Sequence, residues 1–489
     1  MPASTVREYS TGNFRGNAVF VKGLAGRGGF GGHPTMKRLL RALLPLAAIT
    51  AVAAAAPPAQ AETSISAARG FAPRQILVKF EGQRTGRAVP IARGAGVRRS
   101  AMALQQNPNV VYAEPNYVAS ASAAGDPFDP NDSGFLAAGT DSSLPAGDWA
   151  FRQWNFLSPE ARGNSRLPLA PGGIDAVGAW RNLIEAKRPG GAGVVVAVLD
   201  SGIAYRSLGA RFRRSPDFGA DQFVPGYDFV GRDRLPLDES GHGTHVAGTI
   251  AERTDNGLGV TGLAYGAKLM PVRVLDRNGF GNALDIAKGI RFAVAHGAQV
   301  INMSFNFGCG KQVPLVDEAL REAYEEGVVT VASAGNLGSE ACVSAPATGP
   351  RVIGVGGSTE GACLGDYSLT GAAIDLVAPG GGVPQGRCPS VAARPIYQVT
   401  LRPGSTKAFG IPSNYVGTSM AAAHVSGVAA LLLASGRVNP RLSETARVRF
   451  VTRRLRKTAR DLGYPATQQG AGLLNAERAT GTGPRFSGR

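Results

Sequence analysis

Three residues with the chemistry for nucleophilic catalysis each stand in a distinctive local sequence of this 489-residue chain. Asp200 ends the apolar run 193–199 (GVVVAVL), His242 begins a stretch of small residues (HGTHVAGTIA), and Ser419 precedes an Ala-rich one (MAAAHVSGVAALL). A histidine can take the proton of a serine hydroxyl while a carboxylate orients the imidazole ring. The three residues could therefore supply a nucleophile, a base and an orienting group.

Each of these motifs alone has a commoner explanation, which is a turn for Asp-Ser-Gly and a helix cap for the serine. A fourth motif strengthens the catalytic interpretation. Asn336 follows the run 329–335 (VTVASAG), and its side-chain amide can donate a hydrogen bond to an oxyanion. The backbone N–H of Ser419, at the start of a predicted helix, would be a second donor.

The chain has five histidines, and their positions favour one of them as the base. His33 lies upstream of a predicted export signal, and His296 lies on an Ala-rich helical stretch. His242 stands at a helix start between glycines, which leaves its ring free to reach both a nucleophile and a carboxylate. His245, one turn further on, is expected to pack in the interior. The HExxH motif is absent, so a two-histidine zinc site is not expected on this helix.

The elements that would position these residues read as an α/β domain. An unbroken Val/Leu run such as 193–199 is typical of a strand buried on both faces of a parallel sheet. Asp200 then lies at the carboxyl end of that strand, where open α/β sheets place their active sites. Val-rich strands alternate with Ala-rich helices from residue 150 to residue 480, which predicts one three-layer α/β/α domain with a mainly parallel sheet.

Residues 148–479 resemble the subtilisin-like serine proteases (subtilases), with the four motifs in the order Asp, His, Asn, Ser. The resemblance implies a subtilisin-like fold over 148–480 and a monomeric endopeptidase that acts on polypeptides. It implies that Ser419 is the nucleophile, that His242 is its base and that Asp200 orients His242. Asn336 would join the Ser419 N–H in the oxyanion hole.

The same resemblance implies that a peptide substrate binds as an added strand between two segments of the enzyme. Substrate contacts are expected from Gly279, Phe280, Gly281, Ser304, Phe305, Asn306, Ser333 and Ala334. Phe280 replaces a small residue and would narrow the pocket next to the scissile residue. Asn306 replaces a glycine, which would make its pocket either narrower or more polar. Ala423 replaces a proline of the family motif, which would loosen that turn slightly.

A calcium site is a further implication of the resemblance, because residues 255–260 (DNGLGV) resemble a loop that binds calcium in many subtilases. Oxygen ligands would come from the carbonyls of Thr254, Leu258 and Val260 and from the Asn256 side chain, which suits a hard cation. The added carboxylate would be Asp217 or Asp148. A plain solvated loop is the alternative. In the loop before the His242 motif, Asp233 and Asp238 would either bind a second ion or cap turns.

The N-terminal third predicts an exported precursor. Residues 36–61 have a basic start, a short apolar core and an Ala-Gln-Ala end, as in a signal peptide cut after Ala61, and the apolar run is too short to span a membrane. Translation is expected to begin at Met36, with residues 1–35 untranslated or disordered.

A strand at 75–80 and a helix end, turn and strand over 104–117 resemble the propeptide of subtilases, which chaperones folding and then inhibits the enzyme. Residues 62–120 are therefore assigned to a propeptide. Residues 121–147 are assigned to a cleavable linker, and 481–489 to a tail.

Charge and cysteine content narrow the function classes. The net charge is +17, but residues 1–120 carry +11 of it, mostly in segments expected to be removed, so nucleic acid is excluded as a partner.

No CxxC pair occurs, and an even cysteine count in an exported chain predicts two disulfides. Sequential pairing, Cys309–Cys342 and Cys363–Cys388, is the simplest of three possibilities, and free buried thiols are the alternative.

Two rival functions make different predictions. An inactive subtilase-like scaffold has no reason to retain all four motifs, and it would not react with a fluorophosphonate. An esterase of the α/β-hydrolase class needs GxSxG and the order Ser, Asp, His. Here the serine lies in GTSMA and comes last, which excludes that class.

Overall fold

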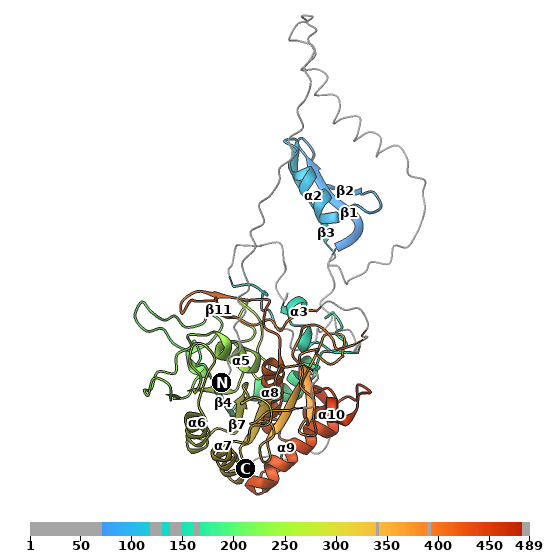
Figure 1. Ribbon diagram of the computed structural model, residues 1–489. Helices are drawn as coiled ribbons and strands as arrows, with labels where there is room; N and C mark the ends of the chain where they lie inside the picture. Colours follow the sequence, from blue (N-terminus) through green and yellow to red (C-terminus); the bar gives the residue numbers. More distant parts are fainter. Residues whose placement is uncertain are drawn as a thin grey trace, which may run out of the picture. The chain divides into compact units, whose positions relative to one another are not determined.

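Residues 148–480, predicted to be the catalytic domain, are called the catalytic part. Seven strands form its central sheet in this computed structural model (Figure 1). The structure describes residues 71–117, 130–136, 149–160, 167–338, 342–386, 388 and 393–481. The predicted signal peptide and Asp148 lie outside these residues. In spatial order the strands are β10 (Leu376–Pro379), β9 (Ile353–Ser358), β8 (Val329–Ser333), β7 (Val300–Met303), β4 (Val195–Asp200), β6 (Lys268–Arg273) and β5 (Tyr227–Asp228). Every neighbouring pair is parallel, so the parallel sheet predicted from the Val-rich runs is confirmed.

Alternate side chains of β4 enter two separate cores because successive residues of a strand point to opposite faces. Val196 and Val198 pack with residues from α4 (Ala176–Glu185), α5 (His242–Ala251), α8 (Thr418–Ala434), α9 (Glu444–Thr458) and α11 (Ala476–Gly481). Ala197 and Leu199 pack with residues from α6 (Ala283–Ala295) and α7 (Pro314–Glu325). The domain therefore has the three layers expected from the sequence.

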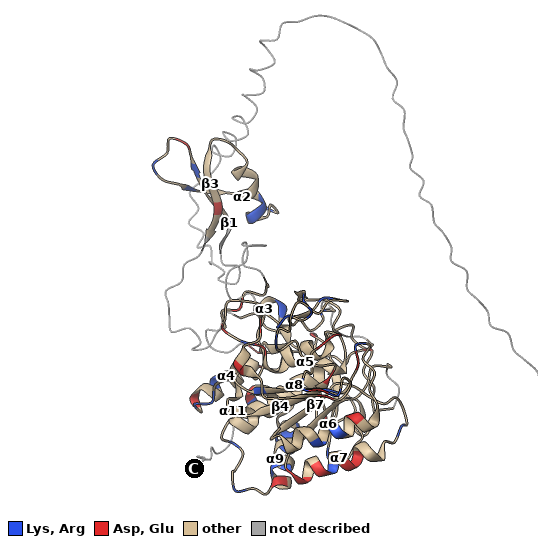
Figure 2. Cartoon of the chain, turned by 90° about the vertical axis from the view of Figure 1, so that its left-hand side faces the viewer, with Lys and Arg blue, Asp and Glu red and all other residues tan. Residues whose placement is uncertain are grey.

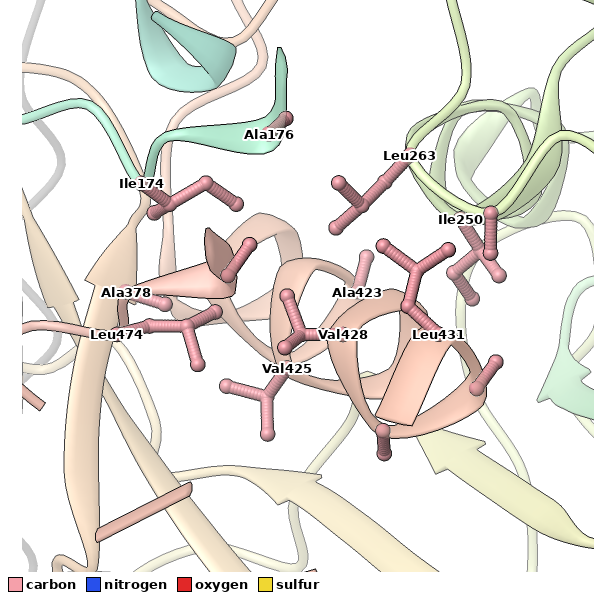
Figure 3. Close-up of a cluster of buried hydrophobic side chains, with 14 of the residues drawn as sticks. Ile174, Ala176, Ile250, Leu263, Ala378, Ala423, Val425, Val428, Leu431 and Leu474 are labelled. Atoms are coloured by element: carbon pink, nitrogen blue, oxygen red, sulfur yellow. The ribbon is translucent and has the colours of Figure 1, made fainter. Parts of the chain in front are cut away.

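Helix α8 carries Ser419 in its first turn and runs through the middle of one core (Figure 3). It is apolar on all sides and is buried from Thr418 to Leu432, as expected for a helix surrounded by protein. Val425, Val428 and Leu431 point into the cluster shown in Figure 3. Gly427 leaves no room for a larger residue, because a Cβ there would lie 2.9 Å from the Cδ2 of Leu263. This packing gives Ser419 a rigid support.

Shorter elements complete the catalytic part. They are α3 (Trp149–Arg152), α10 (Ala466–Gln469) and a hairpin of β11 (Thr400–Leu401) and β12 (Phe409–Gly410). No helix within the described residues has the length and apolar character needed to cross a membrane.

Residues 71–117 form a small α+β unit with a core of its own. Strand β1 (Phe71–Phe80) pairs antiparallel with β2 (Arg87–Pro90) and with β3 (Val110–Tyr117), and α2 (Val97–Gln105) packs on this sheet. Ile76 and Val78 of β1 are fully buried. The strand expected at 75–80 is the second half of β1, and the helix end, turn and strand expected over 104–117 are α2 and β3.

One segment differs from the predicted organisation. Residues 130–136 were expected in the linker, but they bind the loop 254–260 of the catalytic part. The Gly134 N–H donates to the Gly259 carbonyl at 2.7 Å, and the Gly259 N–H donates to the Phe135 carbonyl at 2.7 Å. The buried carboxylate of Asp132 accepts from the N–H groups of Asp255 and Asn256, both at 3.0 Å. These contacts of the predicted linker could not be expected from the sequence, because pairing between distant segments leaves no local signal.

Candidate active site

Asp200 and His242 are joined by a hydrogen bond at the carboxyl edge of the sheet. Asp200 is the last residue of β4 and is fully buried, and its Oδ1 lies 2.8 Å from His242 Nδ1. Burial acts to lower the pKa of His242, but the charge and hydrogen bond of Asp200, with a smaller effect from Asp238, raise it above its usual value. The imidazole side chain remains 30% exposed. It is therefore held on one side and accessible on the other.

A glycine at position 243 allows this close approach. Helix α5 begins at His242, directly beside the turn that follows β4. A Cβ on Gly243 would collide with the Gly202 carbonyl. Gly202 itself has a φ of 101°, which favours glycine in that turn. The glycines around Asp200 and His242 thus serve the contact between them.

Asp238 holds the start of α5 in place, a role that the sequence left open. Its Oδ1 accepts from the N–H groups of Ser240 and Gly241 and from the Ser201 hydroxyl, at 2.9, 3.0 and 2.9 Å. Its Oδ2 accepts from the Thr244 N–H at 3.0 Å and the Thr244 hydroxyl at 2.6 Å. Asp238 is thus a buried cap that brackets His242. Asp233 also caps a turn, by accepting from the Leu235 N–H at 2.7 Å.

Ser419 lies close to a substrate-binding segment predicted from the sequence. Its hydroxyl donates to the Ser304 carbonyl at 3.0 Å, and the Ser304 hydroxyl donates to the Ser419 carbonyl at 2.9 Å. Helices α5 and α8 pack together, and His245 stacks on Tyr415 with ring centroids 3.9 Å apart. In this structure the Ser419 hydroxyl donates to the Ser304 carbonyl and is not hydrogen-bonded to His242.

Two donors are available for an oxyanion beside Ser419. The Oδ1 of Asn336 accepts from both the N–H and the hydroxyl of Thr418, each at 2.8 Å. Because Thr418 holds Oδ1, the Nδ2 of Asn336 points away from Thr418. The Asn336 amide lies beside Gly417, where a Cβ would come within 3.0 Å of Nδ2. The Ser419 N–H belongs to the first turn of α8, where amides have no partner within the helix.

The edge segment 279–281 forms a closed turn. Asp276 Oδ1 accepts from the N–H of Phe280 at 3.0 Å, and the Phe280 carbonyl accepts from the Asp276 N–H at 2.8 Å. Both backbone groups of Phe280 and the N–H of Gly279 are therefore hydrogen-bonded inside the turn. The Phe280 side chain is 75% exposed.

The second segment, 304–306, lies against the residues expected to wall the specificity pocket. The Ser333 hydroxyl donates to the Phe305 carbonyl at 3.4 Å. A Cβ on Gly335 would lie 3.6 Å from Asn306 Nδ2, which places the Asn306 amide beside this wall. Ser344, which the sequence did not single out, donates its N–H to the Ala334 carbonyl at 3.2 Å. Its hydroxyl is buried with no hydrogen-bond partner in the described part of the chain.

Both disulfides predicted from the sequential pairing are present. Cys309 is bonded to Cys342, and Cys363 is bonded to Cys388, with Cα atoms 5.6 and 6.3 Å apart. The described residues contain no free cysteine. The first disulfide joins the segments that follow Asn306 and Asn336, so it links the two segments that are expected to wall the specificity pocket.

The loop expected to bind calcium surrounds a buried carboxylate. Asp217 Oδ1 accepts from Asn256 Nδ2 at 2.8 Å, and its Oδ2 accepts from the Val260 N–H at 3.0 Å. The Asn256 Oδ1 accepts from the Leu258 N–H at 2.9 Å, and Thr254 shares a hydrogen bond with Thr261. Asp217 is thus a carboxylate placed at the loop, and the other candidate, Asp148, lies outside the described residues.

Two more buried carboxylates, Asp132 and Glu252, lie close enough to Asp217 to interact electrostatically. Desolvation raises the pKa of Asp217 to about 8, that of Asp132 to about 6, and that of Glu252 above its usual value. No group of three or more His, Cys, Asp or Glu side chains among the described residues is arranged around a common metal position. A cation at this loop would have to be held by Asp217 together with backbone carbonyls, and its charge would offset the burial of Asp217.

Comparison with known proteins gives consistent results. The model of the subtilase family matches residues 191–473. The thermophilic serine proteinase of Bacillus sp. (strain AK1) is 33% identical over 337 residues, which are 69% of this chain and 66% of that protein. The extracellular protease of Xanthomonas campestris pv. campestris is 36% identical over 59% of this chain and 51% of its own length. The chain thus spans about half to two thirds of these two relatives.

Other relatives are covered more fully. Subtilisin Savinase from Lederbergia lenta is 37% identical over 291 residues, which are 59% of this chain and 91% of that protein. A solved structure of a protease from Pseudoalteromonas arctica PAMC 21717 matches with a TM-score of 0.55 and 30% identity. That match covers 72% of this chain and 99% of the solved chain.

Proposed function

Because this chain belongs to the subtilase family of serine proteases, we propose that it is the precursor of a secreted endopeptidase that cleaves polypeptides through an acyl-enzyme on Ser419. The observation that carries this proposal is the 2.8 Å hydrogen bond between His242 and the buried Asp200. It lies at the edge of the sheet toward which α8 presents Ser419. The relatives named as proteases support the same reaction class.

Each residue of the site has one task in the reaction. The Ser419 hydroxyl attacks the scissile carbonyl while His242 Nε2 takes its proton. Asp200 keeps the proton on Nδ1 and stabilises the imidazolium, as the raised pKa of His242 requires. His242 then returns the proton to the leaving amine, and a water molecule hydrolyses the acyl-enzyme by the same steps.

The tetrahedral oxyanion would accept hydrogen bonds from Asn336 Nδ2 and the Ser419 N–H. Thr418 fixes the orientation of the Asn336 amide through two hydrogen bonds to its Oδ1, so Nδ2 is pre-oriented. Loss of such an asparagine lowers turnover by about 100- to 1,000-fold, a magnitude measured on subtilisin, a member of the same family.

A peptide would bind as a strand between the segments 279–281 and 304–306, with the side chain before the cut in the pocket of Phe305, Asn306, Ser333 and Ala334. Calcium, when bound, would stabilise the loop 254–260 through Asp217, the Asn256 side chain and the carbonyls of Thr254, Leu258 and Val260. It has no part in the chemistry.

Maturation would follow export. Residues 36–61 direct secretion, and the folded unit 71–117 belongs to a propeptide that assists folding and then inhibits the enzyme until Ser419 cleaves the segment after it. The chain is expected to act as a monomer without nucleic-acid or membrane partners.

The decisive experiment compares the wild type with Ser419→Ala after secretion. The wild type should lose residues 62 to about 120 by intact mass, react with a fluorophosphonate and hydrolyse a peptide library. Ser419→Ala should fold, keep these residues and do neither. Ser443→Ala, at an exposed serine whose side chain caps no helix, is the matched control and should behave as the wild type. Self-cleavage of purified Ser419→Ala at the wild-type rate would show that another residue is the nucleophile.

A further inference from the structure

A cavity of 560 Å³ lies at the edge of the catalytic part opposite to the catalytic residues. Its lining includes Asp375 and Val352, which directly precede β10 and β9, and several residues of α9. Asp200, by contrast, is the last residue of β4. Because all strands of the sheet are parallel, amino and carboxyl ends of strands lie at opposite edges (Figure 1). The cavity is therefore separate from the site that cleaves peptides.

The lining of this cavity is strongly cationic. The positively charged side chains are Arg351, Arg449, Arg453, Arg456 and Lys457. Asp375 is the one carboxylate among its described lining residues, and it pairs with Arg456 at 2.9 Å. Four positive charges thus remain unbalanced inside the lining.

These cations differ in whether the protein already uses them. Arg449 donates to the Tyr324 hydroxyl at 2.9 Å, and the Arg351 guanidinium lies over the Tyr324 ring at 5.7 Å from its centroid. Arg453 and Lys457 are exposed, and neither has an ion-pair or hydrogen-bond partner among the residues that the structure describes. Two cations are therefore free to bind a ligand, beside others held in fixed positions.

The charge is concentrated on one helix. Helix α9 contains six basic residues and one acidic residue, whereas residues 121–489 together carry a net charge of only +6. Figure 2 shows Lys and Arg along this helix. Nearly all of the excess charge downstream of the predicted propeptide thus lies on α9, so a general basicity of the domain does not explain it.

We propose that this cavity binds a polyvalent oxyanion, a soluble molecule with two or more phosphate or sulfate groups. The planar guanidinium of arginine binds such groups with two hydrogen bonds, and four of the five cations are arginines. Arg449, Arg453 and Lys457 follow each other at intervals of four residues, so they lie on one face of α9 and span about 12 Å along it. A ligand with a single anionic group could not reach all of them.

The test uses the full chain with Ser419→Ala, so that self-cleavage does not consume the protein. Naphthalene-1,3,6-trisulfonate, a trivalent probe, is titrated by calorimetry at low and moderate salt. The cavity variant is Arg453→Glu with Lys457→Glu. The matched control is Lys407→Glu with Arg441→Glu, which makes the same charge change at exposed positions outside the cavity.

The parent and the control should bind the trisulfonate equally, with an affinity that falls as salt rises. The affinity of the cavity variant for the trisulfonate should be lower by about tenfold or more, because two charged hydrogen bonds are lost. Equal affinity in all three proteins, or no binding to the parent, would overturn the proposal. Unfolding temperatures close to the parent value show that each variant is folded, and glutamine replaces glutamate at both positions if the cavity variant does not fold.

A second measurement separates a soluble ligand from a lipid surface that presents the same groups. Vesicles of phosphatidylglycerol are compared with vesicles of phosphatidylcholine in a co-sedimentation assay. Weak or absent retention by both supports the soluble ligand. Retention by phosphatidylglycerol that depends on Arg453 and Lys457, without trisulfonate binding, would assign the cavity to a membrane surface and overturn the proposal as stated.

Discussion

Ser304 and Ser419 exchange two hydrogen bonds, each hydroxyl donating to the carbonyl of the other residue. The Ser304 hydroxyl also accepts from Asn302 Nδ2 at 2.9 Å, and the Asn302 Oδ1 accepts from the Ser426 hydroxyl at 2.8 Å. A buried network thus connects Asn302 of β7 and the neighbouring Ser304 to Ser419 in the first turn of α8 and to Ser426 further along the helix. Ser304 therefore positions Ser419 as well as belonging to the substrate segment.

Replacing Ser304 by Ala should lower kcat by about fivefold with a smaller change in KM, because one positioning hydrogen bond is worth about 1 kcal/mol. Active-site titration should show that the fraction of competent enzyme is unchanged. Ser207→Ala, at an exposed serine, provides the control. A rise in KM with unchanged kcat would mean that Ser304 serves the substrate alone.

Replacing Asp238 by Asn should reduce both stability and activity. The carboxylate of Asp238 accepts from five donors, whereas an amide presents two donors of its own to the same groups. We expect a loss of about 3 kcal/mol in the free energy of unfolding, measured by urea denaturation in the Ser419→Ala background. Asp233→Asn, which affects one exposed hydrogen bond, should cost less than about 1 kcal/mol. Equal losses in the two variants would contradict the role given to Asp238.

The pH profile of kcat/KM should report the environment of His242. The neutral imidazole is the active base, so activity should rise with pH through a value above the usual 6.5 of histidine, because Asp200 raises the pKa of His242. Asp200→Asn removes the main raising influences and leaves burial, so the rising limb should move to lower pH while kcat falls about 10,000-fold. An unchanged limb in that variant would show that a different group titrates.

Calcium should stabilise the protein more at high pH than at low pH. Burial raises the pKa of Asp217 to about 8, above the value near 4 of an unfolded chain, so without a cation the stability associated with protonated Asp217 is lost as pH rises from about 4 through 8. A bound cation favours the ionised form and removes this loss. The Tm difference between calcium-loaded and calcium-depleted protein should therefore grow from pH 5 to pH 9.

The variants locate that effect. Asp217→Asn should abolish the growth of the Tm difference, and Asp221→Asn, at an exposed carboxylate, should leave it unchanged. A Tm difference that does not vary with pH in the wild type would separate calcium, if bound, from Asp217.

Local patterns were enough to propose Asp200, His242 and Ser419 as the catalytic residues, because each of them lies where a strand or a helix meets a marked turn. The Val run before Asp200 and the small residues after His242 and Ser419 are visible in any short window of the sequence. The sequential disulfide pairing was confirmed.

Contacts between distant segments could not be predicted in this way. Asp132 lies more than 120 residues from the loop that it binds, in a stretch whose composition is typical of a linker. Asp238 was recognised as a carboxylate near the site, but the number of donors around it depends on the path of the loop before α5. The cationic cavity combines residues of α7, α9 and two strand starts, which no single motif unites.

Because residues 130–136 are hydrogen-bonded to the loop 254–260, the position at which the precursor is cut should affect the stability of this loop. A cut upstream of residue 130 leaves Asp132 attached to the mature enzyme, as a clamp at its new amino terminus. A cut within 137–148 would leave residues 130–136 on a separate peptide that can dissociate, and the N–H groups of Asp255 and Asn256 would lose Asp132 as their acceptor. Two mature forms that differ by fewer than twenty residues at the amino terminus would then differ in stability rather than in catalytic rate.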